Sequence, residues 1–268
     1  MPADPSESAP ARPASTVIVA RDVAGGGIEV VLTERHANMR FMAGAYVFPG
    51  GAVQDDDYAT ELAAQLDGAP LDWPHPLDPR HAWAHAVAAL RETFEEVGLL
   101  LGAPASAAAQ LPVLRTKLGA GRPLSALLAE AGIRLDLRQL VPFVQWITPR
   151  AQPIRFDTRF YVSAAPSGQI AEHDGRECVA LIWRSPQAAL ADAEAGRITL
   201  PPPTRRSLAE IEGAVSVAAL LEQARSRPAP HVEPIIREID GTRMILYPGD
   251  PDHPVRERIL RGPVRQPF

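Results

Sequence analysis

The sequence predicts an α/β fold in which helices pack against a mixed β-sheet. Two observations support this class: short β-branched runs recur along the chain, and a long amphipathic helical segment with signals at both ends stands among them. With 268 residues, 46% of them hydrophobic, the chain can bury a sizeable core, and we expect one large domain.

The expected strands form two groups and a terminal hairpin. Glycines 25–27 suggest that the first two strands are joined as a hairpin, and Asp240-Gly241 suggests the same for the last two. The expected strands cover residues 17–20, 28–33, 45–48, 140–147, 159–164, 179–183, 233–240 and 242–247.

The long helix is expected between Asp78 and Gly98. Asp78 is a suitable N-cap, Pro79 suits the first helical position, and Gly98 suits the left-handed position that ends a helix. Shorter helices are predicted elsewhere, with a loop at the proline-rich residues 68–79 and a break at Pro201-Pro202-Pro203-Thr204. These helices cover residues 57–66, 105–118, 123–131, 185–196, 208–211 and 215–224.

Three carboxylates gather on one face of the long helix. At about 100° per residue, an apolar stripe from Trp83 to Val97 faces a core, and Glu92, Glu95 and Glu96 lie on the opposite face. A solvated surface is one interpretation of such a cluster. The preceding turns of that face carry the small or neutral residues His85, Ala88 and Ala89, however, so a bound Mg²⁺ or Mn²⁺ is the alternative that would relieve the repulsion.

Charge and cysteine content narrow the functional classes. The net charge of −5 argues against a binder of nucleic acid or anionic membranes and favours a small-molecule substrate. Cys178, the single cysteine, is expected in a buried strand. Residues 1–14 are expected to form a disordered tail without signal-peptide features, which favours a cytoplasmic protein. The oligomeric state stays open, with a homodimer among the alternatives.

A glycine turn precedes the helix, at Phe48-Pro49-Gly50-Gly51. The turn and the helix together resemble the signature of the Nudix hydrolases, G-x5-E-x7-R-E-U-x-E-E-x-G-U, in which U is a bulky apolar residue. Asp57 stands where the signature has its first Glu, Thr93 fills a usually aliphatic position, and an insertion splits the signature. The matching residues are Gly51, Arg91, Glu92, Glu95, Glu96, Gly98 and Leu99.

This resemblance implies an α/β/α sandwich over residues 15–268. It implies insertions at about residues 53–77 and 103–137, which could form a lobe over the substrate, and a C-terminal extension from about residue 205. Such enzymes hydrolyse a diphosphate linkage in a nucleoside diphosphate derivative with the help of Mg²⁺ or Mn²⁺.

The resemblance also implies roles for individual residues. Glu92, Glu95, Glu96 and the Gly50 carbonyl would bind the metal, and Arg91 would orient a glutamate by ion pairing. The general base would be either a glutamate of the signature or a carboxylate on a distant loop. The loop candidates are Glu172, Asp174 and Glu177.

A narrower resemblance concerns the loop before the glycine turn. Val31-Leu32-Thr33-Glu34-Arg35-His36, Arg40 and Gly44 are similar to the motif of coenzyme A diphosphatases, especially their longer, peroxisomal-type members. This implies coenzyme A or an acyl-CoA as substrate, with Arg35, Arg40, Gly44 and Gly51 in substrate binding. For the arginines, a surface position or a pair with Asp55, Asp56 or Asp57 is the alternative. The alternative functions are a diphosphatase of ADP-ribose or a dinucleotide, and a non-catalytic nucleotide sensor.

Overall fold

The computed structural model describes residues 9–39, 42–74 and 77–268, and its centre is a mixed sheet of eight strands. The strand order is β10-β7-β8-β1-β2-β3, with β4 also paired to β1 and β9 also paired to β2. β1 pairs with β8 in parallel and with β2 and β4 in antiparallel fashion. The strands are β1 Arg12–Asp22, β2 Ile28–Arg35, β3 Tyr46–Val47, β4 Gly50–Ala52, β7 Val141–Ile147, β8 Phe156–Ala164, β9 Cys178–Arg184 and β10 His231–Val232.

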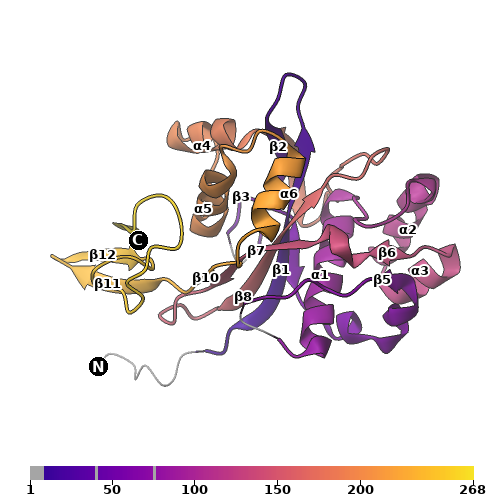
Figure 1. Ribbon diagram of the computed structural model, residues 1–268, viewed down its shortest axis with the longest axis horizontal. Helices are drawn as coiled ribbons and strands as arrows, with labels where there is room; N and C mark the ends of the chain where they lie inside the picture. Colours follow the sequence, from indigo (N-terminus) through magenta and orange to yellow (C-terminus); the bar gives the residue numbers. More distant parts are fainter. Residues whose placement is uncertain (1–8, 40–41, 75–76) are drawn as a thin grey trace.

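Helices cover both faces of this sheet (Figure 1). Alternate residues of β1 serve the two cores: Val17 and Val19 pack on the side of α1, whereas Ile18 and Ala20 pack on the side of α5 and α6. The predicted α/β class with a mixed sheet is therefore confirmed. The helices of the first side are α1 Pro79–Val97, α2 Leu111–Leu118 and α3 Leu124–Ala131; those of the second are α4 Pro186–Glu194, α5 Pro202–Ile211 and α6 Val217–Arg225.

The two segments predicted as insertions pack together. A two-stranded parallel pair joins β5 Leu66–Asp67 to β6 Leu135–Asp136. The predicted helix at 57–66 is instead two 3₁₀ segments, Asp55–Tyr58 and Thr60–Gln65, because the extended backbone at Ala59 separates them. The other 3₁₀ segments are Ala105–Gln110 and Leu137–Gln139.

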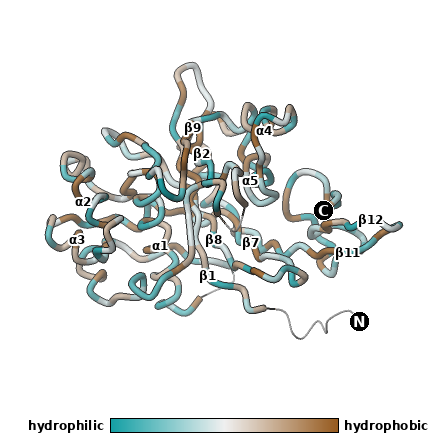
Figure 2. Tube along the Cα trace, turned by 180° about the vertical axis from the view of Figure 1, so that it is seen from behind, coloured by the Kyte–Doolittle hydropathy of each residue, from teal (hydrophilic) through white to brown (hydrophobic). Residues whose placement is uncertain are grey.

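The end of the chain forms a separate three-stranded sheet. Its strands are β11 Ile235–Ile239, β12 Thr242–Leu246 and β13 Arg265–Pro267, of which the β11–β12 hairpin was expected and β13 was not. Figures 1 and 2 show this sheet at the opposite end of the molecule from α2 and α3.

Three predicted boundaries are wrong. β1 begins at Arg12, so residues 12–14 belong to the sheet and not to a disordered tail; residues 1–8 lie outside the described residues. The prolines after Leu200 start α5 and do not break the chain, because the first turn of a helix needs no backbone N–H donor. Residue 205, the predicted start of the C-terminal extension, lies inside α5. Because α5 and α6 form the second helical layer, these residues belong to the sandwich itself.

One buried histidine ties α1 to β1. The His85 Nδ1 lies 3.1 Å from the Ala14 carbonyl oxygen and 3.1 Å from Ser15 Oγ, which donates to the His85 carbonyl at 2.8 Å. Burial lowers the pKa of His85 to about 4. The imidazole is therefore neutral in the folded protein at neutral pH.

We expect His85 to make the protein acid-sensitive. Because its folded pKa lies below the usual 6.5, the unfolded chain binds the extra proton first, so stability is complete above about pH 6.5 and falls towards pH 4. The loss amounts to about 3 kcal/mol. Denaturant unfolding of wild type and His85→Gln between about pH 7 and 4 measures it; parallel pH dependences would contradict the assignment.

Candidate active site

The glycine turn and the C-terminal half of α1 meet beside β1. Gly50 and Gly51 lie in β4, opposite Thr16 and Ser15 of β1. The Gly50 N–H donates to Glu96 Oε2 at 3.0 Å, which joins the turn to the helix. Two segments that lie far apart in the sequence therefore form one site.

Arg91 is the centre of a buried ion-pair network. Its Nε donates to Asp57 Oδ1 at 2.8 Å and its Nη2 donates to Asp57 Oδ2 at 2.9 Å, so the pair is bidentate. Its Nη1 donates to Glu92 Oε1 at 2.7 Å and to Glu95 Oε2 at 3.0 Å. One guanidinium thus fixes the orientation of three carboxylates.

Local contacts account for two of the three departures from the signature. Asp57 is buried, and both of its carboxylate oxygens accept hydrogen bonds from Arg91. Thr93 is fully buried, and its hydroxyl donates to the Ala89 carbonyl at 2.7 Å, which satisfies the polar group at a position that is usually aliphatic.

The face that carries the glutamates is not a solvated surface. Glu92 is 8% exposed and Glu96 is 2% exposed, because β4 and the 3₁₀ segment Asp55–Tyr58 pack against this part of α1. Burial raises the pKa of Glu92 to about 7 despite the opposing charge of Arg91. Burial likewise raises the pKa of Glu95, and burial together with the Glu92 charge raises that of Glu96 well above its ordinary value.

These residues fit a divalent cation by their chemistry. In the described parts of the chain, no three acidic, histidine or cysteine side chains are grouped tightly enough to hold a metal ion as they stand. The donors are nevertheless carboxylate oxygens, which Mg²⁺ and Mn²⁺ prefer. Their raised pKa values reflect buried negative charge that a cation would stabilise.

The loop before β9 brings one of its three acidic candidates near this cluster. The negative charge of Glu177 contributes to the raised pKa values of Glu92, Glu95 and Glu96. The Asp174 carboxylate instead accepts the N–H groups of residues 176–178 and stabilises the turn. Glu172 interacts electrostatically with Arg115, whose guanidinium donates to the backbone carbonyls of Glu95 and Glu96.

Arg35 reaches the same region from the end of β2. Its positive charge lowers the pKa of Glu96, against the larger effect of burial. Gly44 closes the loop that follows, because its N–H donates to the Arg35 carbonyl at 3.0 Å and its φ is +69°. Arg40 lies outside the described residues, and a substrate contact by any of these residues stays a prediction.

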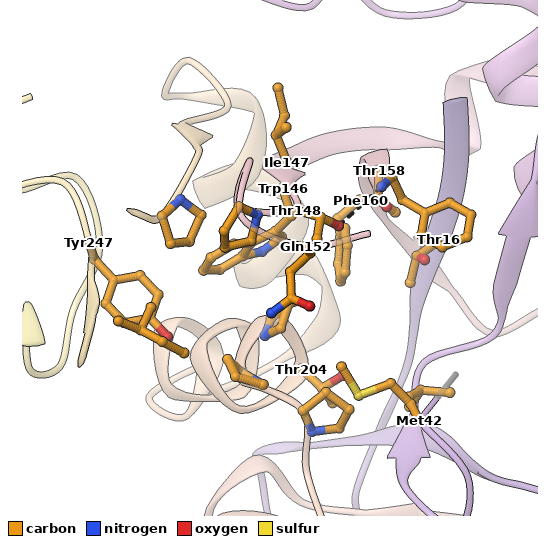
Figure 3. Close-up of a pocket in the computed structure, with 18 of the residues that line it drawn as sticks. Thr16, Met42, Trp146, Ile147, Thr148, Gln152, Thr158, Phe160, Thr204 and Tyr247 are labelled. Carbon is orange, nitrogen blue, oxygen red and sulfur yellow. Dashed lines mark hydrogen bonds between the residues drawn. The ribbon is translucent and has the colours of Figure 1, made fainter. Parts of the chain in front are cut away.

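A cavity of about 550 Å³ opens beside the glycine turn (Figure 3). Its lining residues Phe48, Trp146 and Phe160 belong to the core on the side of the sheet opposite α1. Its walls combine β-sheet residues, the first turn of α5 and the C-terminal sheet. Residues of the two insertions are absent from its described lining, so the predicted lobe does not cover it. Lining residues include Thr16, Arg35, Phe48, Gly50, Trp146, Thr158, Phe160, Pro202, Thr204, Tyr247 and Phe268.

Sequence reasoning missed most of this cavity. The predicted strands at 140–147 and 242–247 contain Trp146 and Tyr247 but had no assigned role, and no element was predicted around Phe268. Strand and helix patterns locate elements, but they do not reveal which distant elements enclose a space. The adjacent Phe48-Pro49-Gly50 turn and Arg35 were the signals in the sequence that pointed to this region.

Gly51→Ala should lower kcat on the order of 10²-fold while leaving stability nearly unchanged. A Cβ at Gly51 would lie 2.4 Å from the Glu92 carboxyl group, so that side chain must move. Gly213→Ala is the matched control, because a Cβ there meets no atom within 4 Å. Turnover and thermal unfolding of both variants test this; full activity of Gly51→Ala would contradict it.

The fold and this site define a Nudix protein: a mixed sheet between helices, a glycine turn, and a helix carrying Arg91 with the three glutamates. The profile of the NUDT19 Nudix domain matches residues 76–211. The chain belongs to this family of Nudix hydrolases.

Two vertebrate relatives and one solved structure illustrate the similarity. The acyl-coenzyme A diphosphatase NUDT19 of Gallus gallus is 27% identical over 86% of this chain and 76% of the relative. Its Homo sapiens counterpart is 26% identical over 89% of this chain and 76% of the relative. The crystal structure of a NUDIX hydrolase from Alicyclobacillus acidocaldarius is 32% identical, with a TM-score of 0.67 over 82% of this chain and 97% of that one.

None of the helices in the described parts of the chain combines the length and the apolar character needed to cross a bilayer.

Proposed function

We propose that this protein hydrolyses the diphosphate linkage of coenzyme A or an acyl-CoA, giving 3′,5′-ADP and 4′-phosphopantetheine or its acyl derivative. The observation that carries the proposal is the buried carboxylate cluster around Arg91, placed beside a glycine turn and Arg35. The names of the vertebrate relatives support the choice of coenzyme A. The reaction adds one water across one phosphorus–oxygen bond of the bridge.

Glu92, Glu95 and Glu96, with the Gly50 carbonyl, would hold Mg²⁺ or Mn²⁺. When bound, the cation supplies charge neutralisation for the diphosphate and makes a water easier to deprotonate. Arg91 keeps Glu92 and Glu95 oriented, and the Gly50 N–H does the same for Glu96.

Glu177 is our preferred general base among the loop carboxylates. It is exposed, and its charge is felt by all three glutamates. Asp174 is less suited because three backbone N–H groups already occupy its carboxylate. A glutamate of the signature is the alternative base, and loss of the pH optimum in Glu177→Gln would separate the two.

Two other functions follow from the same site. The first is a diphosphatase of ADP-ribose or a dinucleotide, which would use the same glutamates with another leaving group. The second is a nucleotide sensor without turnover. The complete set of oriented glutamates argues against it, because ligand binding alone does not require three carboxylates, two of them buried, on one helix face.

A substrate panel tests the proposal. The purified chain is incubated with Mg²⁺ or Mn²⁺ and coenzyme A, acetyl-CoA, ADP-ribose, NADH or a diadenosine polyphosphate, and the products are identified by mass. We expect 3′,5′-ADP from the first two substrates, and no product after chelation. Preference for ADP-ribose would select the first alternative, and no turnover of any substrate would select the sensor.

Arg35→Ala tests whether this arginine binds the nucleotide phosphates. If it contacts the 3′-phosphate, the fall in kcat/KM for coenzyme A should correspond to a loss of about 1.5–3 kcal/mol of transition-state stabilisation. The loss should be clearly smaller for dephospho-coenzyme A, which lacks that phosphate. Exposed Arg122, in the insertion, is the matched control as Arg122→Ala. Equal losses for both substrates would make Arg35 a residue that only supports the loop.

A further inference from the structure

The 550 Å³ cavity begins at the glycine turn. Gly50 and Thr16, which pair across β4 and β1, both line it. The Gly50 N–H also donates to Glu96. Glu92, Glu95 and Glu96 do not line the cavity themselves, so one arm of a substrate held at them would enter it past Gly50 and Arg35.

The walls of the cavity suit an uncharged arm. Its described lining is mostly aromatic and aliphatic, with six prolines and several threonine and glutamine side chains. Arg35 has the one charged side chain among the described residues that line the cavity, and its charge acts on Glu96. A phosphate deeper in the cavity would lose hydration without gaining a counter-charge from these walls.

Trp146 adds a specific polar feature to this wall. The side chain is 4% exposed, and its indole Nε1 has no hydrogen-bond partner within the described structure. A buried N–H donor without a partner costs free energy. An amide carbonyl of a ligand in the cavity could accept this hydrogen bond, and a pantetheine arm contains two amides.

The C-terminal segment closes the far side. Gln266, Pro267 and Phe268 line the cavity opposite the sheet residues, and Figure 3 shows Tyr247 on the side away from Thr16. β13 holds this segment on β12, and the Phe268 N–H donates to the Arg243 carbonyl at 2.9 Å. Phe268 is 54% exposed, which places it where the cavity meets solvent.

Taken with the proposed function, on which this inference rests, the geometry points to a division of the substrate. We propose that the cavity binds the pantetheine arm, with Trp146 donating to an amide carbonyl, and that Phe268 contacts the acyl chain where it leaves the cavity. The 3′,5′-ADP half stays on the side of Arg35. The C-terminal sheet, and not the inserted helices, then sets the acyl preference.

Binding of S-octanoyl-pantetheine tests the cavity without hydrolysis, because this probe has no phosphate. Calorimetry measures the binding. We expect saturable binding to the wild-type protein and at least tenfold weaker binding to Thr158→Phe, because the phenylalanine ring would fill the inner cavity. Free 3′,5′-ADP should not compete. Competition by 3′,5′-ADP, or equal affinity of the two proteins, would overturn the proposal, and this result is independent of whether the protein hydrolyses coenzyme A.

An acyl-chain series tests Phe268. In Phe268→Ala, the ratio of kcat/KM for octanoyl-CoA to that for coenzyme A should fall about threefold to tenfold, since the ring contacts the acyl chain alone. This exposed position keeps the test valid if Thr158→Phe fails to fold. Val113→Ala, which removes an exposed apolar side chain from α2, is the matched control and should keep the wild-type ratio. An unchanged ratio in Phe268→Ala, or a reduced ratio in Val113→Ala, would overturn the assignment while leaving coenzyme A hydrolysis intact.

Discussion

Glu96→Gln is expected to lower kcat on the order of 10²–10³-fold, the scale for removing one electrostatic stabiliser from an active site. Glu96 is fully buried beside the glycine turn, where its carboxylate accepts the Gly50 N–H at 3.0 Å. The amide oxygen of Gln can still accept that hydrogen bond, so the turn should survive while the negative charge is lost. Steady-state kinetics with Mg²⁺ measure the effect.

Stability separates this prediction from simple misfolding. Without metal, Glu96→Gln should unfold at no lower temperature than wild type, because it removes a buried charge that Glu92 repels. The folded pKa of Glu96 is raised, so the charged form destabilises wild type only as the pH rises above about 4.5, and the variant should gain most at alkaline pH. The exposed Glu222→Gln is the control. A strongly destabilised Glu96→Gln with normal kcat would contradict the site.

The fold was predictable where local patterns are strong. The capped helix at 79–97 was correct because N-cap, proline and C-terminal glycine signals agree, and Ser185 likewise caps α4. The prolines at the start of α5 were misread because a first-turn proline and a helix breaker look alike in sequence. Only the packing of α5 on the sheet distinguishes the two.

The candidate site was only partly predictable. The signature located Arg91 and the glutamates, but the insertion obscured that Asp57 is the partner of Arg91, since 34 residues separate them. The burial of the glutamates also escaped the helical wheel, because the 3₁₀ segment and β4 that cover them belong to other parts of the chain. Contacts of this kind depend on tertiary packing, which periodicity does not encode.

The Arg91 network should respond asymmetrically to mutation. Asp57→Asn leaves Arg91 paired with Glu92 and Glu95, so we expect a loss of about 1–3 kcal/mol in the free energy of unfolding. Arg91→Met leaves three carboxylates without their common partner, and we expect a loss of about 3–5 kcal/mol. Denaturant unfolding of both metal-free variants near pH 8 measures the difference.

The pH dependence gives the cause of this asymmetry. Because the pKa of Glu92 is already raised to about 7, lowering the pH towards 5.5 protonates it, and the loss in Arg91→Met should shrink more than the loss in Asp57→Asn. Both variants should also lose activity, since the glutamates are no longer held in place.

The surface pair Arg21–Glu29 is the control: Glu29→Ala should lower the free energy of unfolding by about 1 kcal/mol or less. Equal losses in Asp57→Asn and Arg91→Met at both pH values would mean that the site carries no excess of buried negative charge, and the case for a cation there would fail with it.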